Sequence, residues 1–279
     1  METYSKFRLN LYTKILLFMV FCLAAFSNRT EASHLMGMDL TYECLGGNQY
    51  EFTLNFYRDC SSSLGAPSTL IIDINSASCG SDNTVMLTQL GSATDISPLC
   101  ASALSTCNGG SNPGAEHYKY TGIFTLPSTC ADWVFSYSLC CRNASITNLV
   151  SPSSQDLYIE SRLDNSSGLC NSSPTFSTLP VPYICKGQLT NYGLGAIDSD
   201  GDSLVYTLVN ALGEFGASSP PVPDTLLYVA PYSPTYPMTT DSGFVVFDSF
   251  TGNLTLTPDT TQTCIVTVLV EEYRNGILI

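Results

Sequence analysis

Apolar and polar residues alternate with a period of two through most of this chain, and helical periodicity is nearly absent after the first 32 residues. Successive side chains of a β-strand point to opposite faces of a sheet, so the pattern fits strands with one buried face. Short strands separated by turn residues predict an all-β chain built from β-sandwiches. We expect strands at 39–44, 51–57, 70–75, 85–90, 118–126, 133–141, 157–163, 204–209, 244–248, 253–257 and 264–273.

Two turns predict hairpins, one at 45–48 and one at 275–276. The strands expected at 39–44 and 51–57 flank the turn Leu45-Gly46-Gly47-Asn48. Near the other end, Asn275-Gly276 is the dipeptide preferred in a two-residue hairpin turn, and the apolar residues 277–279 begin a return strand. We expect this chain to be a fragment of a longer protein that completes that strand. The alternative is that 277–279 pair as a short final strand.

The N-terminus predicts a cleaved signal peptide over residues 1–32. Three basic residues, Lys6, Arg8 and Lys14, precede an apolar run at 15–26, and Thr30-Glu31-Ala32 offers small residues at a cleavage site. The run is shorter than the ~20 apolar residues of a membrane-spanning helix. We therefore expect a secreted or surface-exposed protein with no integral membrane segment after cleavage.

The charge balance excludes one class of partner. The sequence has 24 acidic and 10 basic residues, for a formal net charge of −14. Such a surface repels phosphate backbones, so nucleic-acid binding is not expected. An acidic surface suits an exported protein or one that gathers cations.

The cysteine content predicts disulfides. Of twelve cysteines, Cys22 lies in the predicted signal peptide, which leaves eleven in the mature chain. Exported chains with this many cysteines are usually stapled by disulfides, and we expect five disulfides and one free thiol. Because Cys140 and Cys141 would face opposite sides of a strand, we expect them to have different partners. With only two histidines and no C-x-x-C, a zinc site is not expected.

A break in the alternation divides the mature chain. The stretch 165–182, which contains N-S-S-G-L-C-N-S-S-P, is rich in turn residues. We predict two β-sandwich domains, a disulfide-rich one at 33–170 and an immunoglobulin- or cadherin-like one at 171–279.

The stretch D-S-D-G-D at 198–202 is the strongest candidate for a binding site. It places Asp198, Asp200 and Asp202 two residues apart around Gly201, directly before the strand expected at 204–209. Carboxylates this crowded repel one another, and a hard cation such as calcium offsets that repulsion. The spacing does not fit an EF-hand, which needs glycine at its sixth position and glutamate at its twelfth. A solvated acidic turn without a metal is the equally weighted alternative.

Motifs for catalysis are missing from the sequence. It contains no G-x-S-x-G, H-E-x-x-H or P-loop pattern, and we expect His117 to be a surface residue. We expect Trp133 to lie in the core. Three tyrosines in a proline-rich loop could form a platform for sugars, but padding of the loop is the favoured reading (Tyr228, Tyr232 and Tyr236). The absence of catalytic motifs favours a non-catalytic surface protein. The alternative is a secreted protein that acts on carbohydrates, either a carbohydrate-binding module or a carbohydrate-active enzyme with paired carboxylates.

Several stretches together resemble the N-terminal region of large exported surface proteins of the Bacteroidota, described as adhesin-like or gliding-associated. They are S-H-L-M-G-M-D-L-T-Y-E-C (33–44), F-Y-R-D-C (56–60), W-V-F-S-Y (133–137), C-R-N-A-S-I (141–146), N-S-S-P-T-F (171–176), D-S-D-G-D (198–202), F-D-S-F-T-G-N-L-T-L-T-P (247–258) and V-E-E-Y-R-N-G (270–276). The resemblance implies an adhesin-like or structural role with an unknown glycan or protein ligand, and further immunoglobulin-like repeats downstream.

Two further expectations follow from these resemblances. D-x-D-G-D also opens a strand in cadherin-like repeats, where an acidic residue at the end of the last strand can help to hold a cation. Glu271 and Glu272 occupy that place here and are weaker candidates than the aspartates. Because the related proteins are bacterial, we interpret the N-glycosylation sequons as loop composition (Asn143, Asn165, Asn171 and Asn253).

Overall fold

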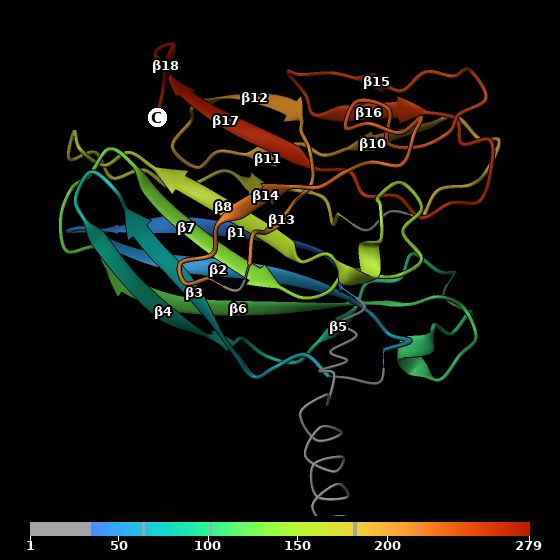
Figure 1. Cartoon of the computed structure of the whole chain (residues 1–279), viewed down its shortest axis with the longest axis horizontal. Helices are drawn as coiled ribbons and strands as arrows, with labels where there is room; N and C mark the ends of the chain where they lie inside the picture. Colours follow the sequence, from blue (N-terminus) through green and yellow to red (C-terminus); the bar gives the residue numbers. More distant parts are fainter. Residues whose placement is uncertain (1–34, 63–64, 101, 181–182, 217) are drawn as a thin grey trace, which may run out of the picture. The chain divides into compact units, whose positions relative to one another are not determined.

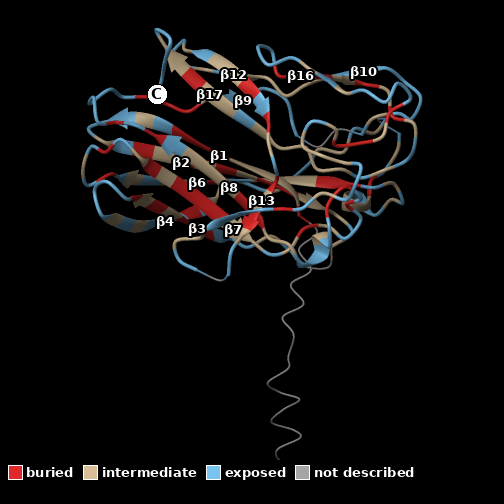
Figure 2. Ribbon diagram, turned by 45° about the horizontal axis from the view of Figure 1, so that its top comes forward, coloured by how far each residue is buried: buried red, intermediate tan, exposed pale blue. Residues whose placement is uncertain are grey.

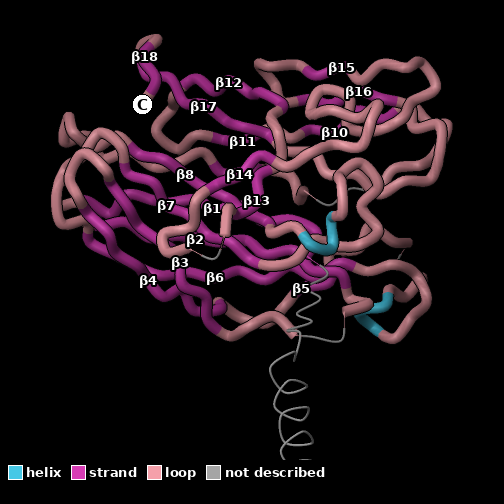
Figure 3. Tube along the Cα trace, viewed as in Figure 1, coloured by secondary structure: helices cyan, strands magenta, loops and turns pink. Residues whose placement is uncertain are grey.

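The structure is a computed structural model, which describes residues 35–279 except 63–64, 101, 181–182 and 217. The predicted signal peptide, 1–32, lies outside the described residues. The expected all-β fold is confirmed, and the helical elements of the described part are two single 3₁₀ turns, Thr106–Asn108 and Pro152–Ser154 (Figure 3). Among the described residues, no helix has the length and apolar character needed to span a membrane.

One antiparallel sheet of eight strands forms most of the N-terminal part (Figure 1). Its path runs β1-β2-β6-β4-β3-β7-β8, and β5 pairs with β6. The two ends of this path meet, because the Ser161 hydroxyl on β8 donates to the Leu40 carbonyl on β1 at 2.9 Å. The sheet therefore curls on itself in a barrel-like arrangement. The strands are β1 (Leu35–Gly46), β2 (Gln49–Asp59), β3 (Thr69–Ser76), β4 (Ser81–Gln89), β5 (Thr94–Asp95), β6 (Ala115–Thr125), β7 (Trp133–Leu139) and β8 (Leu157–Leu163).

The inner face of this sheet holds the main core, as the alternation predicts. Figure 2 shows buried residues recurring along these strands. Trp133 is fully buried, which confirms its assignment to the core, and its indole Nε1 donates to Asn165 Oδ1 at 3.1 Å. Phe135 packs edge-on against Phe52 and Tyr42, with ring centroids 4.8 and 5.3 Å apart. Such pairs stabilise a core beyond the area that they bury.

The C-terminal part consists of short strands in four small antiparallel sheets. The expected hairpin turn is confirmed: Asn275 and Gly276 have φ of 53° and 79° and join β17 to β18. The strands are β9 (Thr175–Phe176), β10 (Thr190–Gly193), β11 (Ala196–Ile197), β12 (Ser203–Leu208), β13 (Leu212–Glu214), β14 (Pro223–Thr225), β15 (Val246–Phe247), β16 (Asn253–Leu256), β17 (Val268–Arg274) and β18 (Ile277–Leu278). Their pairings are β10-β16-β15, β12-β17-β18, β11-β9 and β13-β14.

The predicted segments 33–170 and 171–279 share direct contacts. The backbone N of Ser173 donates to the Tyr42 carbonyl at 2.9 Å, and the Ser172 hydroxyl accepts from the backbone N of Cys44 at 3.2 Å. The described residues belong to one compact unit by their contacts. The division into two domains stays a prediction.

The disulfide pattern differs from the predicted one in two ways. Four disulfides are present, Cys44–Cys170, Cys60–Cys107, Cys79–Cys130 and Cys140–Cys141. The expectation that Cys140 and Cys141 have different partners is wrong, because β7 ends at Leu139 and strand alternation does not extend to these cysteines. The expectation of a single free thiol is also wrong for the described residues, where three cysteines are free (Cys100, Cys185 and Cys264). Several disulfides indicate an oxidising, extracytoplasmic environment.

Thiol titration tests this pattern directly. For protein beginning at residue 33, we expect three free thiols after unfolding without reductant. In the native state Cys100 and Cys185 should react quickly, since both are exposed. Cys264 should react slowly, because burial raises the pKa of its thiol and the thiolate is the reactive form. A count of one, or of most of the eleven cysteines, would contradict the pattern.

Candidate metal centre

The acidic turn at 198–202 is held by its own backbone. Asp198 Oδ1 accepts hydrogen bonds from the backbone N of Asp200 at 2.9 Å and of Asp202 at 2.8 Å. Gly201 has φ of 87°, which a residue with a Cβ rarely adopts. The side-chain oxygen and the glycine together fix the tight turn that leads into β12.

Strand β17 brings a fourth acidic residue to this turn. β12 and β17 are antiparallel neighbours, and Glu272 lies opposite Leu204, two residues beyond Asp202. One carboxylate oxygen each of Asp198, Asp202 and Glu272 lies within 4.8 Å of the others. The structure thus groups two of the aspartates with Glu272, which is distant in sequence. Glu271 lies next to it opposite Val205 and is not a member of this group.

Asp200 has a different set of partners. Its Oδ2 accepts a hydrogen bond from the backbone N of Ser172 at 2.8 Å and lies 3.9 Å from Arg274 Nη2. The third aspartate therefore connects the turn to the segment 171–173 and does not belong to the closest carboxylate group.

Two buried carboxylate oxygens in the cluster have no hydrogen-bond donor within the part of the chain that the structure describes. They are Asp198 Oδ2 and Glu272 Oε1. Glu272 is 6% exposed, and its burial, reinforced by Asp202 and Asp198, raises its pKa to about 8 although Asn171 Nδ2 donates to Oε2 at 3.1 Å. A buried acceptor without a partner is costly, so this carboxylate takes up a proton or needs a cation.

Arg274 and Asn171 belong to this site but were not predicted from the sequence. Arg274 Nε donates to both carboxylate oxygens of Asp202, at 2.8 and 3.1 Å, and this pairing lowers the pKa of Asp202. Arg274 Nη2 also donates to Asn171 Oδ1 at 2.6 Å. A signal existed, because Glu272 and Arg274 are two residues apart on one strand and so share a face.

The comparisons with known proteins give no relative for this site. No protein-family model, no curated protein and no solved structure matches this chain. What the site can do therefore follows from its own residues. The atoms through which the three carboxylates could bind a metal are all oxygens. Hard cations such as calcium prefer oxygen ligands more strongly than transition metals do.

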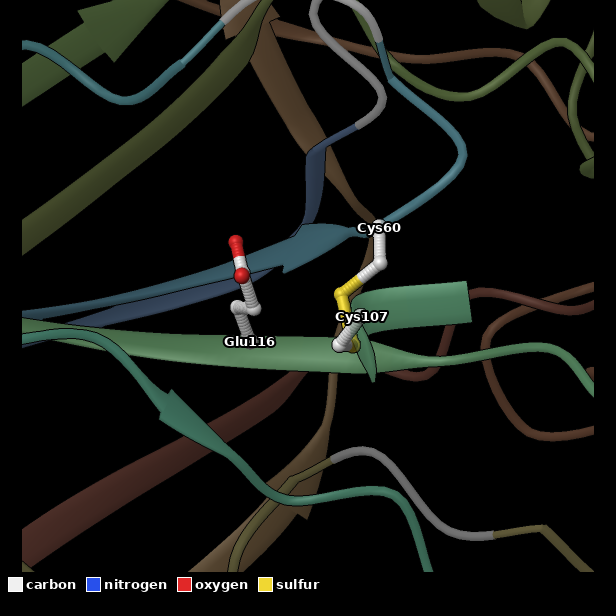
Figure 4. A group of neighbouring side chains, drawn as sticks. All are labelled: Cys60, Cys107 and Glu116. Carbon is white, nitrogen blue, oxygen red and sulfur yellow. A yellow bond between two sulfur atoms is a disulfide. The ribbon is translucent and has the colours of Figure 1, made fainter. Parts of the chain in front are cut away.

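Two other groups of metal-ligating residue types do not fit a metal. Figure 4 shows Cys60 and Cys107 joined by a disulfide beside Glu116. Cys140 and Cys141, near Asp156, are likewise bonded to each other. Metals bind the thiolate form, which a disulfide sulfur does not provide.

The other residues singled out from the sequence pack against or form hydrogen bonds with their neighbours. His117 lies within β6, half-buried and stacked on Tyr57 with ring centroids 5.0 Å apart, and its side chain stays partly exposed at the surface. Tyr228 packs against a small core, and its hydroxyl accepts from the Ala211 backbone N at 3.3 Å, which fits padding of the loop. Asn165 and Asn171 are 1% and 3% exposed, so neither amide has room for a glycan.

Proposed function

We propose that this chain is an exported, non-catalytic part of an adhesin-like or structural surface protein, and that a bound calcium ion stabilises its fold. The observation that carries the metal assignment is the group of Asp198, Asp202 and Glu272, two of whose buried carboxylate oxygens have no hydrogen-bond donor among the described residues. The signal-like N-terminus and the disulfides support export.

The charges around the group favour a divalent cation. Asp198, Asp200, Asp202 and Glu272 face a single cation, Arg274, whose guanidinium is directed at Asp202 and Asn171. Full ionisation leaves an excess of three negative charges. Calcium accepts six to eight oxygen ligands and tolerates irregular geometry, so it suits these carboxylates together with backbone carbonyls or water.

The position of the group suggests its role. Ser172, whose backbone N donates to Asp200, also accepts through its hydroxyl from the backbone N of Cys44 at 3.2 Å. The hydroxyl of Ser173 accepts from the backbone N of Tyr42 at 2.8 Å. The same short segment thus touches the acidic turn on one side and β1 on the other. Calcium bound to the carboxylates would offset their repulsion and so make the connection between the curled sheet and the C-terminal strands more rigid.

Thermal unfolding with and without calcium tests the proposal. A ligand in hundredfold excess over its Kd stabilises the folded state by ~2.7 kcal/mol. For a chain of this size that corresponds to a rise in Tm of roughly 5–10 °C. Asp198→Asn should reduce the rise, because it removes charge from the group.

Asp241→Asn is the matched control, because Asp241 is exposed and lies outside the group. It should respond to calcium like the wild type. An unchanged Tm of the wild type at saturating calcium would contradict the metal assignment.

The non-catalytic role has a separate test. A panel of polysaccharides should show no turnover by the purified protein. Hydrolysis of any of them, abolished by one Asp or Glu substitution, would favour the enzyme alternative.

A further inference from the structure

A polar cleft lies on the outward face of the first sheet, away from the main core. It has a volume of about 360 Å³, within the usual range for small-molecule sites. Its floor is the polar side of β1, β2 and β6, where Asp39, Asn55 and Lys119 are cross-strand neighbours. Its other wall is the segment 175–179, which begins with β9.

The floor carries a connected set of polar side chains. Asn55 Nδ2 donates to Asp39 Oδ1 at 2.7 Å, and the Tyr57 hydroxyl donates to Asp39 Oδ2 at 3.1 Å. His117 Nε2 lies 2.8 Å from Asn55 Oδ1. These contacts hold the groups in place before any ligand arrives, which lowers the entropy lost on binding.

The network also fixes which atoms can accept hydrogen bonds. Burial lowers the pKa of His117, so its ring is neutral at physiological pH. Because Asn55 Oδ1 can only accept, His117 Nε2 carries the proton and Nδ1 is an acceptor. The Asp39 carboxylate keeps lone pairs beyond its two bonds. The floor thus offers several hydrogen-bond acceptors to a ligand, beside the Lys119 ammonium as a donor.

The charge of the cleft selects among such ligands. Glu43 and Glu51 lie directly opposite each other across β1 and β2, and both line the cleft. These two carboxylates outnumber Lys119, so an anionic ligand is disfavoured. On the opposite wall, Phe176 lines the cleft and is 37% exposed.

We propose that this cleft binds a neutral saccharide, whose hydroxyls donate to the acceptor-rich floor and whose apolar ring face packs on Phe176. An uncharged polyol supplies many donors without the charge that the acidic floor would repel, and aromatic rings pack well against its C–H face. This inference deepens the proposed adhesin-like role by giving it a ligand class. It does not depend on the calcium assignment, although β9 pairs with β11 immediately before Asp198.

Titration of the full mature chain with defined sugars tests the inference. The probes are methyl glycosides of glucose, galactose, mannose and their N-acetylamino derivatives, with glucuronate and glucosamine as charged comparisons, followed by calorimetry or saturation-transfer NMR. At least one neutral glycoside should bind at millimolar concentration and more tightly than glucuronate, the anionic comparison. Phe176→Ala should weaken that binding about tenfold or more, a typical effect of removing an anchoring aromatic.

Matched variants separate binding from folding. Phe250→Ala removes a more exposed ring outside the cleft and should leave binding unchanged. Asp39→Asn should weaken binding, whereas Asp82→Asn, on an exposed position of β4, should not. Absence of binding by every neutral glycoside, tighter binding of glucuronate, or full affinity in Phe176→Ala would overturn the inference. Titrations in calcium and in chelator keep this outcome distinct from failure of the calcium site.

Discussion

Replacing Cys44 and Cys170 together by serine is expected to lower the free energy of unfolding by about 2–4 kcal/mol. This disulfide closes the longest loop of the four, with a sequence separation of 126 between its cysteines. Without it the unfolded chain gains conformational freedom, although Cys79–Cys130 inside the loop limits that gain. Urea denaturation under oxidising conditions measures the change.

Cys100→Ser is the control for this experiment, since Cys100 is exposed and free. Its midpoint should stay within the usual range of surface substitutions. A double Cys44/Cys170 variant as stable as the wild type would show that this disulfide contributes little to holding β1 against the segment that follows β8.

Arg274→Gln is expected to lower the stability of the calcium-free protein by about 2 kcal/mol, between the values for exposed and buried ion pairs. The substitution leaves Asp202, whose side chain is 5% exposed, without its guanidinium partner. It also removes the hydrogen bond to Asn171 Oδ1. Added calcium should recover part of the loss, because the variant has a larger charge excess for the ion to offset.

Arg162→Gln is the matched control for Arg274. Arg162 pairs with Glu160 but its side chain is 72% exposed, so its loss should cost less than about 1 kcal/mol. Thermal unfolding of both variants in chelator and in calcium gives the comparison. An Arg274→Gln variant that matches Arg162→Gln under both conditions would contradict the role given to Arg274.

The strand pattern could be predicted because the core has one face per strand. Phe52, Leu54 and Phe56 are all buried, as their alternation requires, and the hairpin of β1 and β2 formed as expected. The expected strand at 264–273 begins only at Val268. Ahead of it, the Asn148 side chain bonds to the backbone N and carbonyl of Ile265, a partner that local alternation cannot reveal.

Only the part of the candidate metal centre that is local in the sequence could be predicted. The spacing of the three aspartates is local and could be read directly, whereas Arg274 and Asn171 join them only through the pairing of β12 with β17 and the course of 171–173. Cys140 and Cys141 show the converse limit. Strand alternation ends with β7 at Leu139, so the expectation that these two cysteines have different partners, which assumed a strand through 141, is wrong.

Direct calcium binding tests the central claim most sharply. Equilibrium dialysis or calorimetry of the mature protein should find one calcium ion per chain, with an affinity that falls about tenfold or more in Glu272→Gln. Glu272 is chosen because it comes from β17 and joins the turn at 198–202 only in the folded chain. Glu43→Gln, an exposed strand carboxylate outside the group, should bind calcium like the wild type. No calcium uptake by the wild type, or equal affinity in Glu272→Gln, would contradict the claim.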